Sequence, residues 1–360
     1  MKNAPTAQAV HGAAELGSVV VETYNAELRD TEGFIGDRAS NRAFRVIVDE
    51  LRDRLKQVGE DPLGETPTAD LSRKKLDKVL QEGDPEAAGV VHGAIEEFAG
   101  EFTAVIARFL KLRAWRDVQS IVIGGGLRAS RIGELVIGRT SVLLKSAGHK
   151  IDLLPIHHHP DHAGLVGAVH LAPAWMFEGY EGILAVDIGG SNLRAGVVEL
   201  NLKKKKDFSR CAVQELDLWR YADEPEKPTR EQAVTRIGEM LKRLIRHSEQ
   251  KLKLAPFIGL ACPGLIDAQG NIERGGQNLP GNWESSRFNL PARIREMVPQ
   301  VGEHDTMIVM HNDAVVQGLS ELPFIEEAVT HWGVMTIGTG LGNAAFTSRK
   351  GAPREEKPVT

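Results

Sequence analysis

The sequence predicts an α/β fold, and two observations carry this prediction. Short apolar runs with strand character alternate with longer segments of helical periodicity along the chain. Several of the apolar runs end in glycine turns, as buried strands often do where they lead into the next element. With 360 residues the chain can bury two medium-sized cores, which favours two domains.

Composition excludes several classes of protein. Hydrophobic residues make up 42% and charged residues 26%, as in ordinary globular proteins. The net charge of −5 gives no general attraction to nucleic acid or to an anionic membrane, and no apolar run reaches membrane-spanning length. Because the two cysteines, Cys211 and Cys262, form no disulfide framework, we expect a soluble cytoplasmic protein.

The first half of the chain is predicted to be mainly helical. Helical apolar periodicity covers 39–58 and 71–82. A third helix begins at the cap Asp84, with Pro85 in its first turn, and runs to about Leu112. Four elements follow: a buried strand at 120–127 that ends in glycines, a helix at 130–147, a strand at 151–156 and a helix at 161–178.

The second half is predicted to be richer in strands. A hairpin covers 183–200, and residues 265–290, rich in Gly, Asn and Pro, are interpreted as an exposed binding loop. The other predicted elements are a strand at 211–217, a helix at 229–250, strands at 256–261 and 306–311, a helix after 312, and a strand–turn–strand unit at 333–342.

The turn of the 183–200 hairpin carries the most informative residues. Asp187 ends the first strand, and Gly189, Gly190, Ser191 and Asn192 follow it. Because the glycines leave the backbone unobstructed, N–H groups of this turn can approach a phosphate. Asp187 is placed to hold a hydrated Mg²⁺ beside such phosphates.

Two more glycine turns end strands. They contain Gly338, Thr339, Gly340 and Gly342 in one case, and Gly124, Gly125 and Gly126 in the other. Two such turns beside an Asp and a Thr suit a clamp on a nucleoside triphosphate, because phosphate oxygens require many fixed donors. The third turn leaves space for a flat adenosine. Each turn taken alone has a purely structural interpretation as well.

Asn312 and Asp313 lie where a strand ends and a helix begins. A carboxylate there can accept the proton of a hydroxyl that attacks a γ-phosphate, and Asn312 can bond a neighbouring hydroxyl. The alternative is a helix cap, for which Asn and Asp are preferred. The loop at 275–283 adds amide side chains and Trp283, which suit a polyol, or it is a plain surface turn.

Together these segments resemble the ROK family of sugar kinases. The resembling segments are 185–191 and 336–342 for the two phosphate motifs, 258–267 and 278–283 for the sugar-side loops, and 311–314 for the catalytic segment. The resemblance implies an actin/hexokinase-like (ribonuclease H-like) fold of two domains, with ATP and Mg²⁺ as cofactors. It implies transfer of phosphate to a hexose, most often at the 6-hydroxyl, with glucose as the first guess, and it suggests a homodimer.

The same resemblance implies roles for individual residues. Asp313 would be the general base, Asp187 would hold Mg²⁺ through water, and Asn278, Asn312 and Gly264 would lie at the sugar. After Gly342 the family sequence continues with an element that resembles 12–18 of this chain, which makes Glu15 an implied sugar ligand. Residues 124–126 resemble the family's adenosine loop, and 161–169 resemble its last helix.

The order of these motifs resembles a circularly permuted ROK kinase. The smaller domain would span 181–311, and the larger, discontinuous domain would combine 1–178 with 312–360. Ser18 stands where the family usually has a zinc-binding His, and 19–44 contains neither Cys nor His, so no structural zinc is expected. Glu32 and Asp37 both stay open as replacements for the family's second sugar-binding Glu.

Two other functions stay open. One is a catalytically degenerate ROK protein that senses sugar, although the presence of both Asp187 and Asp313 argues against it. The other is a zinc metallohydrolase, because His157, His159, Asp161 and His162 match the His-x-His-x-Asp-His pattern of such enzymes. Against this second function, the resemblance to the last kinase helix already accounts for Asp161 and the residues after it.

Overall fold

The structure of the protein, a computed structural model, describes residues 9–349. The described chain forms two compact units. Unit 1 comprises the residues up to Asn25, His157–Thr330, and the residues from Phe346 onward, and unit 2 comprises Ala26–Ile156 and His331–Ala345. No helix within 9–349 combines the length and the apolar character that crossing a bilayer requires.

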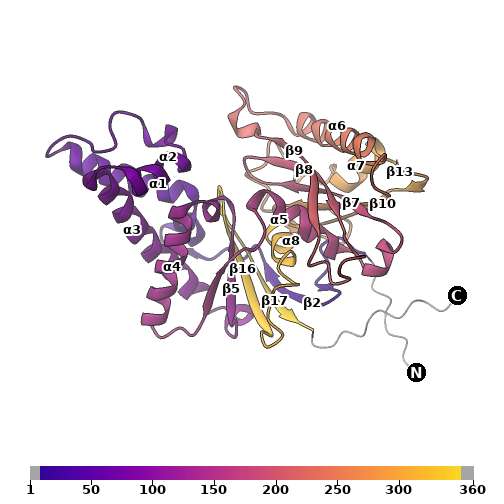
Figure 1. Ribbon diagram of the computed structural model, residues 1–360, viewed down its shortest axis with the longest axis horizontal. Helices are drawn as coiled ribbons and strands as arrows, with labels where there is room; N and C mark the ends of the chain where they lie inside the picture. The colour runs from indigo at the N-terminus through magenta and orange to yellow at the C-terminus, as the bar shows by residue number, and fades with distance from the viewer. Residues whose placement is uncertain (1–8, 350–360) are drawn as a thin grey trace. The chain divides into compact units, whose positions relative to one another are not determined.

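Unit 1 is built on a five-stranded sheet with the order β15-β10-β7-β8-β9 (Figure 1). Its strands are β7 (Gly182–Ile188), β8 (Leu193–Glu199), β9 (Ala212–Trp219), β10 (Leu254–Cys262) and β15 (Met307–Asn312). β7, β8 and β9 are antiparallel neighbours, whereas β10 runs parallel to both β7 and β15. Every residue of β7 is buried, as expected of a strand covered on both faces.

Four helices belong to unit 1: α5 (Pro160–Gly167), α6 (Arg230–Ser248), α7 (Leu290–Met297) and α8 (Asp313–Leu319). In Figure 1, α6 and α7 lie on one side of the sheet, and α5 and α8 lie on the other. A capping box of Thr229 and Gln232 begins α6, as two reciprocal side-chain-to-backbone hydrogen bonds. α5 packs against α8 and against β7 and β8.

A six-stranded sheet draws strands from both ends of the chain, in the order β1-β2-β17-β16-β5-β6. These strands are β1 (Glu15–Leu16), β2 (Val19–Tyr24), β5 (Ser120–Gly124), β6 (Asp152–Pro155), β16 (His331–Ile337) and β17 (Leu341–Ser348). β16 runs parallel to β5, and β5 runs parallel to β6. Only three residues join β16 to β17, so this neighbouring pair is a hairpin.

The helices of unit 2 are α1 (Asn41–Lys56), α2 (Arg73–Glu82), α3 (Pro85–Phe109) and α4 (Arg131–Ser146). Each begins with a side-chain cap, from Ser40, Ser72, Asp84 and Ser130 respectively, so the Asp84 cap predicted from the sequence is confirmed. Fully buried aromatic side chains of α3, among them Phe98 and Phe102, fill the core between these helices.

The two sheets share one strand order. In unit 1, β7 is followed along the chain by β8 and β9 on one side of it and then by β10 and β15 on the other. In the second sheet β16 takes the place of β7, with β17 and β2 on one side and β5 and β6 on the other. The strands of the second sheet therefore follow the same order as those of the first only if the chain is read from β16 to β17 and then continues from β2 to β5 and β6.

The predicted α/β class is confirmed, but two segments differ from their predictions. The helix predicted at 161–178 ends at Gly167 and continues as two short 3₁₀ turns, Ala168–Leu171 and Ala174–Phe177, because Pro173 cannot continue the hydrogen-bond ladder. The segment predicted as a loop at 265–290 contains the short strands β11 (Leu265–Ile266) and β12 (Ile272–Arg274). α7 directly after it was missed, although Asn289 caps it and Pro291 lies in its first turn.

Candidate active site

Three parallel strands of unit 1 end at one edge of its sheet. The register pairs Asp187 of β7 with Ala261 of β10, and pairs Ala261 with His311 of β15. One step further, Cys262 pairs with Asn312. Because parallel strands deliver their carboxyl ends to the same edge, Asp187 and the Asn312–Asp313 pair are brought together there. Asp187 and Asp313 are two acidic residues for which the sequence predicted a role in the active site.

Asp187 is almost completely buried, and a single guanidinium group approaches it. Its side chain is 2% exposed, and Arg194 of β8 places Nη1 3.4 Å from Oδ2. The same Arg194 donates from Nε to Oδ1 of Asp161 at 2.8 Å, and its Nη2 lies 2.7 Å from that oxygen as an ion pair. Burial raises the pKa of Asp187, the positive charge of Arg194 opposes this shift, and the negative charge of Asp161 adds to it.

Asp313 is the first residue of α8, and its carboxyl group has an unusual acidity. Burial, followed by the negative charge of Asp187, raises the pKa of Asp313 to about 7, although its side chain is partly exposed. A carboxyl group with this pKa is half-ionised near neutral pH and can accept a proton there. The pKa of Asp313, the residue predicted from the sequence to be the general base, therefore suits that role.

The charges at this edge of unit 1 fit a divalent cation. The carboxyl group of Asp187 interacts electrostatically with those of Asp161 and Asp313, and Arg194 is a cation that contacts Asp161 and Asp187. The negative charge therefore exceeds the positive charge. Burial is the main cause of the raised pKa values of Asp187 and Asp313, and the neighbouring carboxylates add to it. A hydrated Mg²⁺ near Asp187 would compensate it with one protein carboxylate and solvent as ligands.

The hairpin turn after Asp187 is held by hydrogen bonds of its own. The N–H of Gly189 donates to the carbonyl of Asn192 at 2.8 Å, and the hydroxyl of Tyr221 donates to the carbonyl of Gly189. The carbonyl of Ser191 accepts from the N–H of Ala222 at 3.1 Å. Gly189 therefore uses its N–H within the turn, while Gly190, Ser191 and Asn192 are partly exposed.

Asn312 acts as the helix cap that the sequence offered as its alternative. Its Oδ1 accepts the N–H groups of Ala314 and Val315 at 3.0 and 3.3 Å, and its Nδ2 donates to the carbonyl of Gly264 at 3.0 Å. Gly264 has φ of +106°, a left-handed conformation that favours glycine. Asn312 thus fixes the Gly264 loop against Asp313, and a sugar contact of Asn312 stays a prediction.

The 275–283 loop differs in part from its predicted role. Asn278 is exposed, but Trp283 is 1% exposed and its Nε1 donates to the carbonyl of Pro280 at 2.7 Å. Trp283 packs in the hydrophobic core of unit 1 beside Phe288. The expectation that this aromatic ring suits a polyol is therefore wrong, because a ring buried in the core cannot contact a ligand.

Residues from the two ends of the chain meet inside unit 1. The N–H of Gly12 donates to the carbonyl of Met310 at 3.0 Å, and Nε2 of His311 lies 3.0 Å from the carbonyl of Ala13. Because Nδ1 of His311 accepts the N–H of Asn312 at 2.7 Å, the ring proton is on Nε2 and donates to Ala13. Burial lowers the pKa of His311 to about 4, so the ring is neutral.

Glu15, the predicted sugar ligand, lies on β1 at the protein surface. Its side chain is 71% exposed and its Oε2 lies 2.6 Å from Nη2 of Arg349. The carboxylate is thus paired with a cation from the other end of the chain. Its role at a sugar stays a prediction, as do those of Asn278 and Gly264.

The other two glycine turns belong to unit 2, where they are adjacent. Thr336 pairs with Gly124 in the parallel register of β16 and β5, so the turns that follow both strands lie at one sheet edge. The 124–126 turn contacts the backbone of Ile337 through Gly125, and the carbonyl of Gly126 accepts from Arg73. The N–H of Asn41, at the start of α1, donates to the carbonyl of Gly338 at 3.0 Å.

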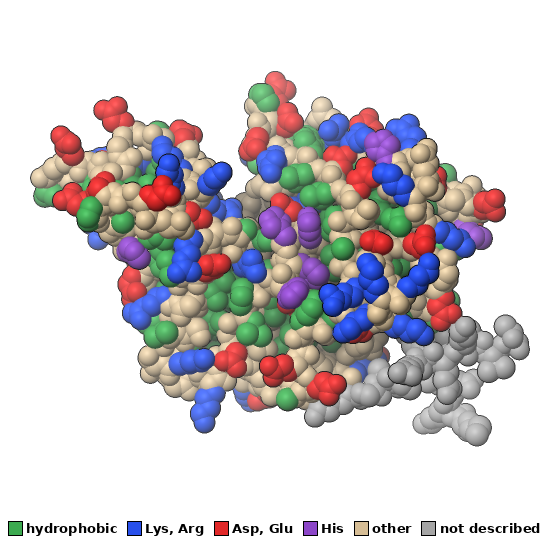
Figure 2. Space-filling view, viewed as in Figure 1, with side chains coloured by type: hydrophobic (Ala, Val, Ile, Leu, Met, Phe, Trp, Pro, Cys, Tyr) green, Lys and Arg blue, Asp and Glu red, His purple; other side chains and the backbone are tan. Residues whose placement is uncertain are grey.

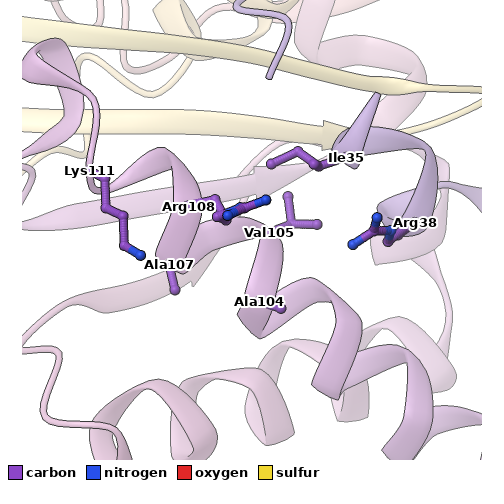
Figure 3. Close-up of a pocket in the computed structure, with 7 residues that line it drawn as sticks. All are labelled: Ile35, Arg38, Ala104, Val105, Ala107, Arg108 and Lys111. Carbon is purple, nitrogen blue, oxygen red and sulfur yellow. The ribbon is translucent and has the colours of Figure 1, made fainter. Parts of the chain in front are cut away.

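Unit 2 also contains a pocket of about 310 Å³ beside α3 (Figure 3). Its lining residues are Ile35, Arg38, Ala104, Val105, Ala107, Arg108 and Lys111, none of which the sequence singled out. Arg38 donates to Asp30 at 2.6 Å and to Glu32 at 2.8 Å, so part of its positive charge is compensated. The pocket contains none of the predicted site residues.

The histidine cluster is not arranged as a metal site. Several His side chains gather on the face shown in Figure 2, but within 9–349 no group of three His, Cys, Asp or Glu side chains could hold a metal ion together. Asp161 is bound by Arg194, His159 caps α5, and the ring of His157 stacks on Phe324 with centroids 3.9 Å apart. The metallohydrolase alternative is therefore not favoured.

The link between Asp161 and Arg194 was not predicted from the sequence. Arg194 lies within the hairpin motif itself, seven positions after Asp187, and Asp161 lies in the segment that resembles the last kinase helix. The sequence feature that could have indicated this ion pair is an Arg in the same β-hairpin as Asp187. No pattern in one sequence identifies which carboxylate such an Arg will contact.

Comparison with known proteins gives one sequence match of note. The chain is 26% identical over 166 residues to a glucokinase from Thermotoga maritima, covering 46% of this chain and 44% of the glucokinase. This relative is a sugar kinase, so the match agrees with the resemblance found in the sequence. The match does not show a circular permutation, and the chain spans less than half the length of this relative. No family model matches the chain.

Among solved structures, the likenesses to this chain have low TM-scores. A ROK hexokinase from Thermus thermophilus is 19% identical, with a TM-score of 0.34, and the likeness covers 47% of this chain and 48% of the hexokinase. A PPX-GPPA enzyme from Aquifex aeolicus is 14% identical, with a TM-score of 0.32, and the likeness covers 63% of this chain and 83% of that enzyme. Likenesses of this size carry no argument about activity.

Proposed function

We propose that this protein is a sugar kinase that transfers the γ-phosphoryl group of ATP to a hydroxyl of a hexose, in the first place the 6-hydroxyl of glucose. The observation that carries the proposal is Asp313, whose pKa is raised to about 7 at the sheet edge that also holds Asp187. The 166-residue similarity to a glucokinase supports the same activity.

Asp313 is the general base in this proposal. In its ionised form it accepts the proton of the sugar hydroxyl as that oxygen attacks the γ-phosphorus. Asn312 fixes the position of Asp313 by capping α8 and by holding the Gly264 loop. The bond between the γ-phosphorus and its bridging oxygen breaks, and ADP leaves with that oxygen. The proton ends on an Oδ of Asp313, and the phosphoryl group ends on the sugar.

In this proposal, Asp187 and the glycine turns bind the phosphate groups of ATP, Asp187 through Mg²⁺ and the turns through backbone donors. Asp187 would hold Mg²⁺ through water, and when bound the ion would neutralise phosphate charge. The turns at 189–192 and 338–342 offer backbone donors to phosphate oxygens, and the 124–126 turn offers a surface for adenosine. Asn278 and Glu15 are proposed to bind sugar hydroxyls.

We also propose that the chain is circularly permuted relative to ordinary ROK kinases, with lobes of about 181–311 and of 1–178 plus 312–360. Three observations support this. The second sheet follows the strand order of the first only across the chain ends, Gly12 bonds to Met310, and the N–H of Arg349 donates to the carbonyl of Ser18 at 2.8 Å. A chain that joins 349 to 9 through a short linker and opens between 178 and 181 should fold and keep its activity. Loss of folding in that variant would count against the permutation.

The test of the function is ADP release from ATP and Mg²⁺ in the presence of a panel of hexoses. We expect release that depends on one or more hexoses and is lost in Asp313→Asn. A folded wild-type protein that releases no ADP with any hexose would contradict the proposal. If the same protein binds a hexose without turnover, the sugar-sensing alternative is favoured instead.

A further inference from the structure

We propose that Asp161 is a positioning residue, which holds the guanidinium of Arg194 so that the charge of Asp187 stays available to Mg²⁺ and the nucleotide phosphates. The inference rests on the proposed function, because it assigns a task within the phosphate half of that site. It concerns a side chain that would not touch substrate and acts through Arg194.

The geometry shows that Arg194 is shared unequally between two carboxylates. It donates from Nε to Oδ1 of Asp161 at 2.8 Å and places Nη2 2.7 Å from the same oxygen, whereas its contact with Oδ2 of Asp187 is long, at 3.4 Å. The side chain of Arg194 is 13% exposed, so solvent competes little for its N–H groups. Asp161 therefore determines the direction of the guanidinium plane.

Arg194 also lies beside the hairpin turn. An added Cβ on Gly189 would come within 4.0 Å of Nη1 of Arg194. The N–H groups that Asp161 leaves free on Nη1 are thus located between the Asp187 carboxylate and the turn proposed to hold phosphate. In this position the guanidinium can contribute positive charge to a phosphate without forming a tight pair with Asp187.

Removal of Asp161 should change this balance. Asp187 would then be the only carboxylate left to Arg194, and a close pair between them would form at low dielectric, where ion pairs are strong. That pair would neutralise Asp187 and compete with Mg²⁺. Asp161 prevents this because it engages the guanidinium through a hydrogen bond from Nε and a close ion pair with Nη2.

The element that bears Asp161 is suited to a positioning role. Its N–H donates to Nδ1 of His159, the cap of α5, at 3.2 Å, and Pro160 begins the helix. α5 packs against both β7, which bears Asp187, and α8, which begins at Asp313. A side chain on this packed helix holds its partner with little freedom.

The experiment compares Asp161→Asn with wild type, with Asp161→Glu as the conservative variant. Asp217→Asn is the matched control, because Asp217 pairs with Arg243 in the same unit and is similarly exposed, at 22% against 29% for Asp161. Binding of ADP with and without Mg²⁺ is measured by calorimetry in the absence of sugar, and the KM values for Mg·ATP and for hexose are measured separately.

We expect Asp161→Asn to weaken Mg²⁺-dependent ADP binding by about 10- to 100-fold, as for residues that orient metal-site groups. The KM for Mg·ATP should rise while the KM for hexose stays unchanged. Asp161→Glu should recover part of the affinity, and Asp217→Asn should bind as wild type does. Thermal unfolding of all variants shows that each is folded.

Two results would overturn the inference: unchanged Mg²⁺-dependent ADP binding in Asp161→Asn, or an equal loss in Asp217→Asn. These results are distinguishable from failure of the proposed function. If the wild type phosphorylates hexoses and Asp161→Asn behaves identically, only the inference falls. If the wild type binds Mg·ADP but phosphorylates no hexose, the function falls, and the ADP measurement still decides the role of Asp161.

Discussion

Gly164 of α5 leaves no space for a side chain beside the carboxyl group of Asp187. A Cβ added to Gly164 would lie 2.6 Å from Cγ of Asp187 and 2.9 Å from each of its carboxyl oxygens. Gly164 stands one helical turn after Asp161 on the same helix, so one surface of α5 both accommodates Asp187 and binds its Arg194 partner. Several predictions about the site depend on this close approach of helix and strand.

Replacement of Gly164 by Ala should displace the Asp187 carboxylate. A shift of about 1 Å in a catalytic group costs on the order of 100-fold, so we expect kcat/KM for hexose phosphorylation to fall by about 10- to 100-fold. Gly100→Ala is the control, because Gly100 lies within α3 and its added Cβ would meet no atom within 4 Å. Steady-state kinetics check both variants, and equal activities would contradict the displacement.

Replacement of Asp313 by Asn should abolish most of the sugar phosphorylation. A positioned general base contributes about 10²- to 10⁴-fold, so kcat should fall by that factor while hexose binding persists. Asp305→Asn, at an exposed position on β14 (His304–Asp305), should leave kcat unchanged. A coupled ADP assay measures the rates, and a variant of Asp313 with wild-type kcat would exclude it as the base.

The pH dependence of kcat/KM should report the ionisation of Asp313. Its pKa is about 7 in the free protein, and only the ionised carboxylate can accept the proton. Activity should therefore fall on the acidic side of about pH 7, approaching tenfold per pH unit. The profile is measured between about pH 5.5 and 8.5, and a flat profile over this range would contradict the assignment.

The same raised pKa makes Asp313 a cost to stability at neutral and alkaline pH. The carboxyl group binds its proton more tightly in the folded state, at a pKa of about 7, than at its ordinary value of 3.8, so its contribution to stability is lost as the pH rises through this window. Asp313→Asn should raise the free energy of unfolding at pH 8 by about 2 to 4 kcal/mol. Urea unfolding should show no such gain below about pH 4.

The ionisation of His311 should have the opposite effect on the pH dependence of the free energy of unfolding. Its pKa is lowered from 6.5 to about 4 by burial, so the unfolded state binds a proton that the folded state excludes, and stability is lost as the pH falls from about 6.5 to 4. The loss should reach up to about 3 kcal/mol. His311→Gln should flatten the pH dependence of urea unfolding over this range, whereas His304→Gln, at an exposed position, should not.

Most helices and strands could be predicted from the sequence, because the caps and apolar patterns within each segment agree with its burial in the fold. Asp84 and Pro85 mark the start of α3, and the apolar run predicted as a buried strand at 120–127 forms the buried strand β5. The exceptions have physical causes. Pro173 interrupts a helical pattern that is otherwise continuous, and short strands such as β11 and β12 are too brief to show a periodicity.

The candidate site was predicted less completely than the fold. Asp187 and Asp313 reach one sheet edge, because the carboxyl ends of parallel strands determine that position. The burial of Trp283 and the pairing of Asp161 with Arg194 depend on contacts between segments far apart in the chain. Composition and spacing do not encode such contacts, so the aromatic ring was misplaced and the ion pair was missed.

The strand order of the second sheet has a consequence for synthesis on the ribosome. All five strands of the unit 1 sheet, namely β7, β8, β9, β10 and β15, have emerged from the ribosome before β16 is made. This sheet can therefore assemble while translation continues. β2 and β5, made early, must wait for β16 and β17, among the last elements of the chain, before they gain their central neighbours. The nascent protein therefore carries unpaired strand edges for most of its synthesis, and these edges are where chaperones would be expected to act.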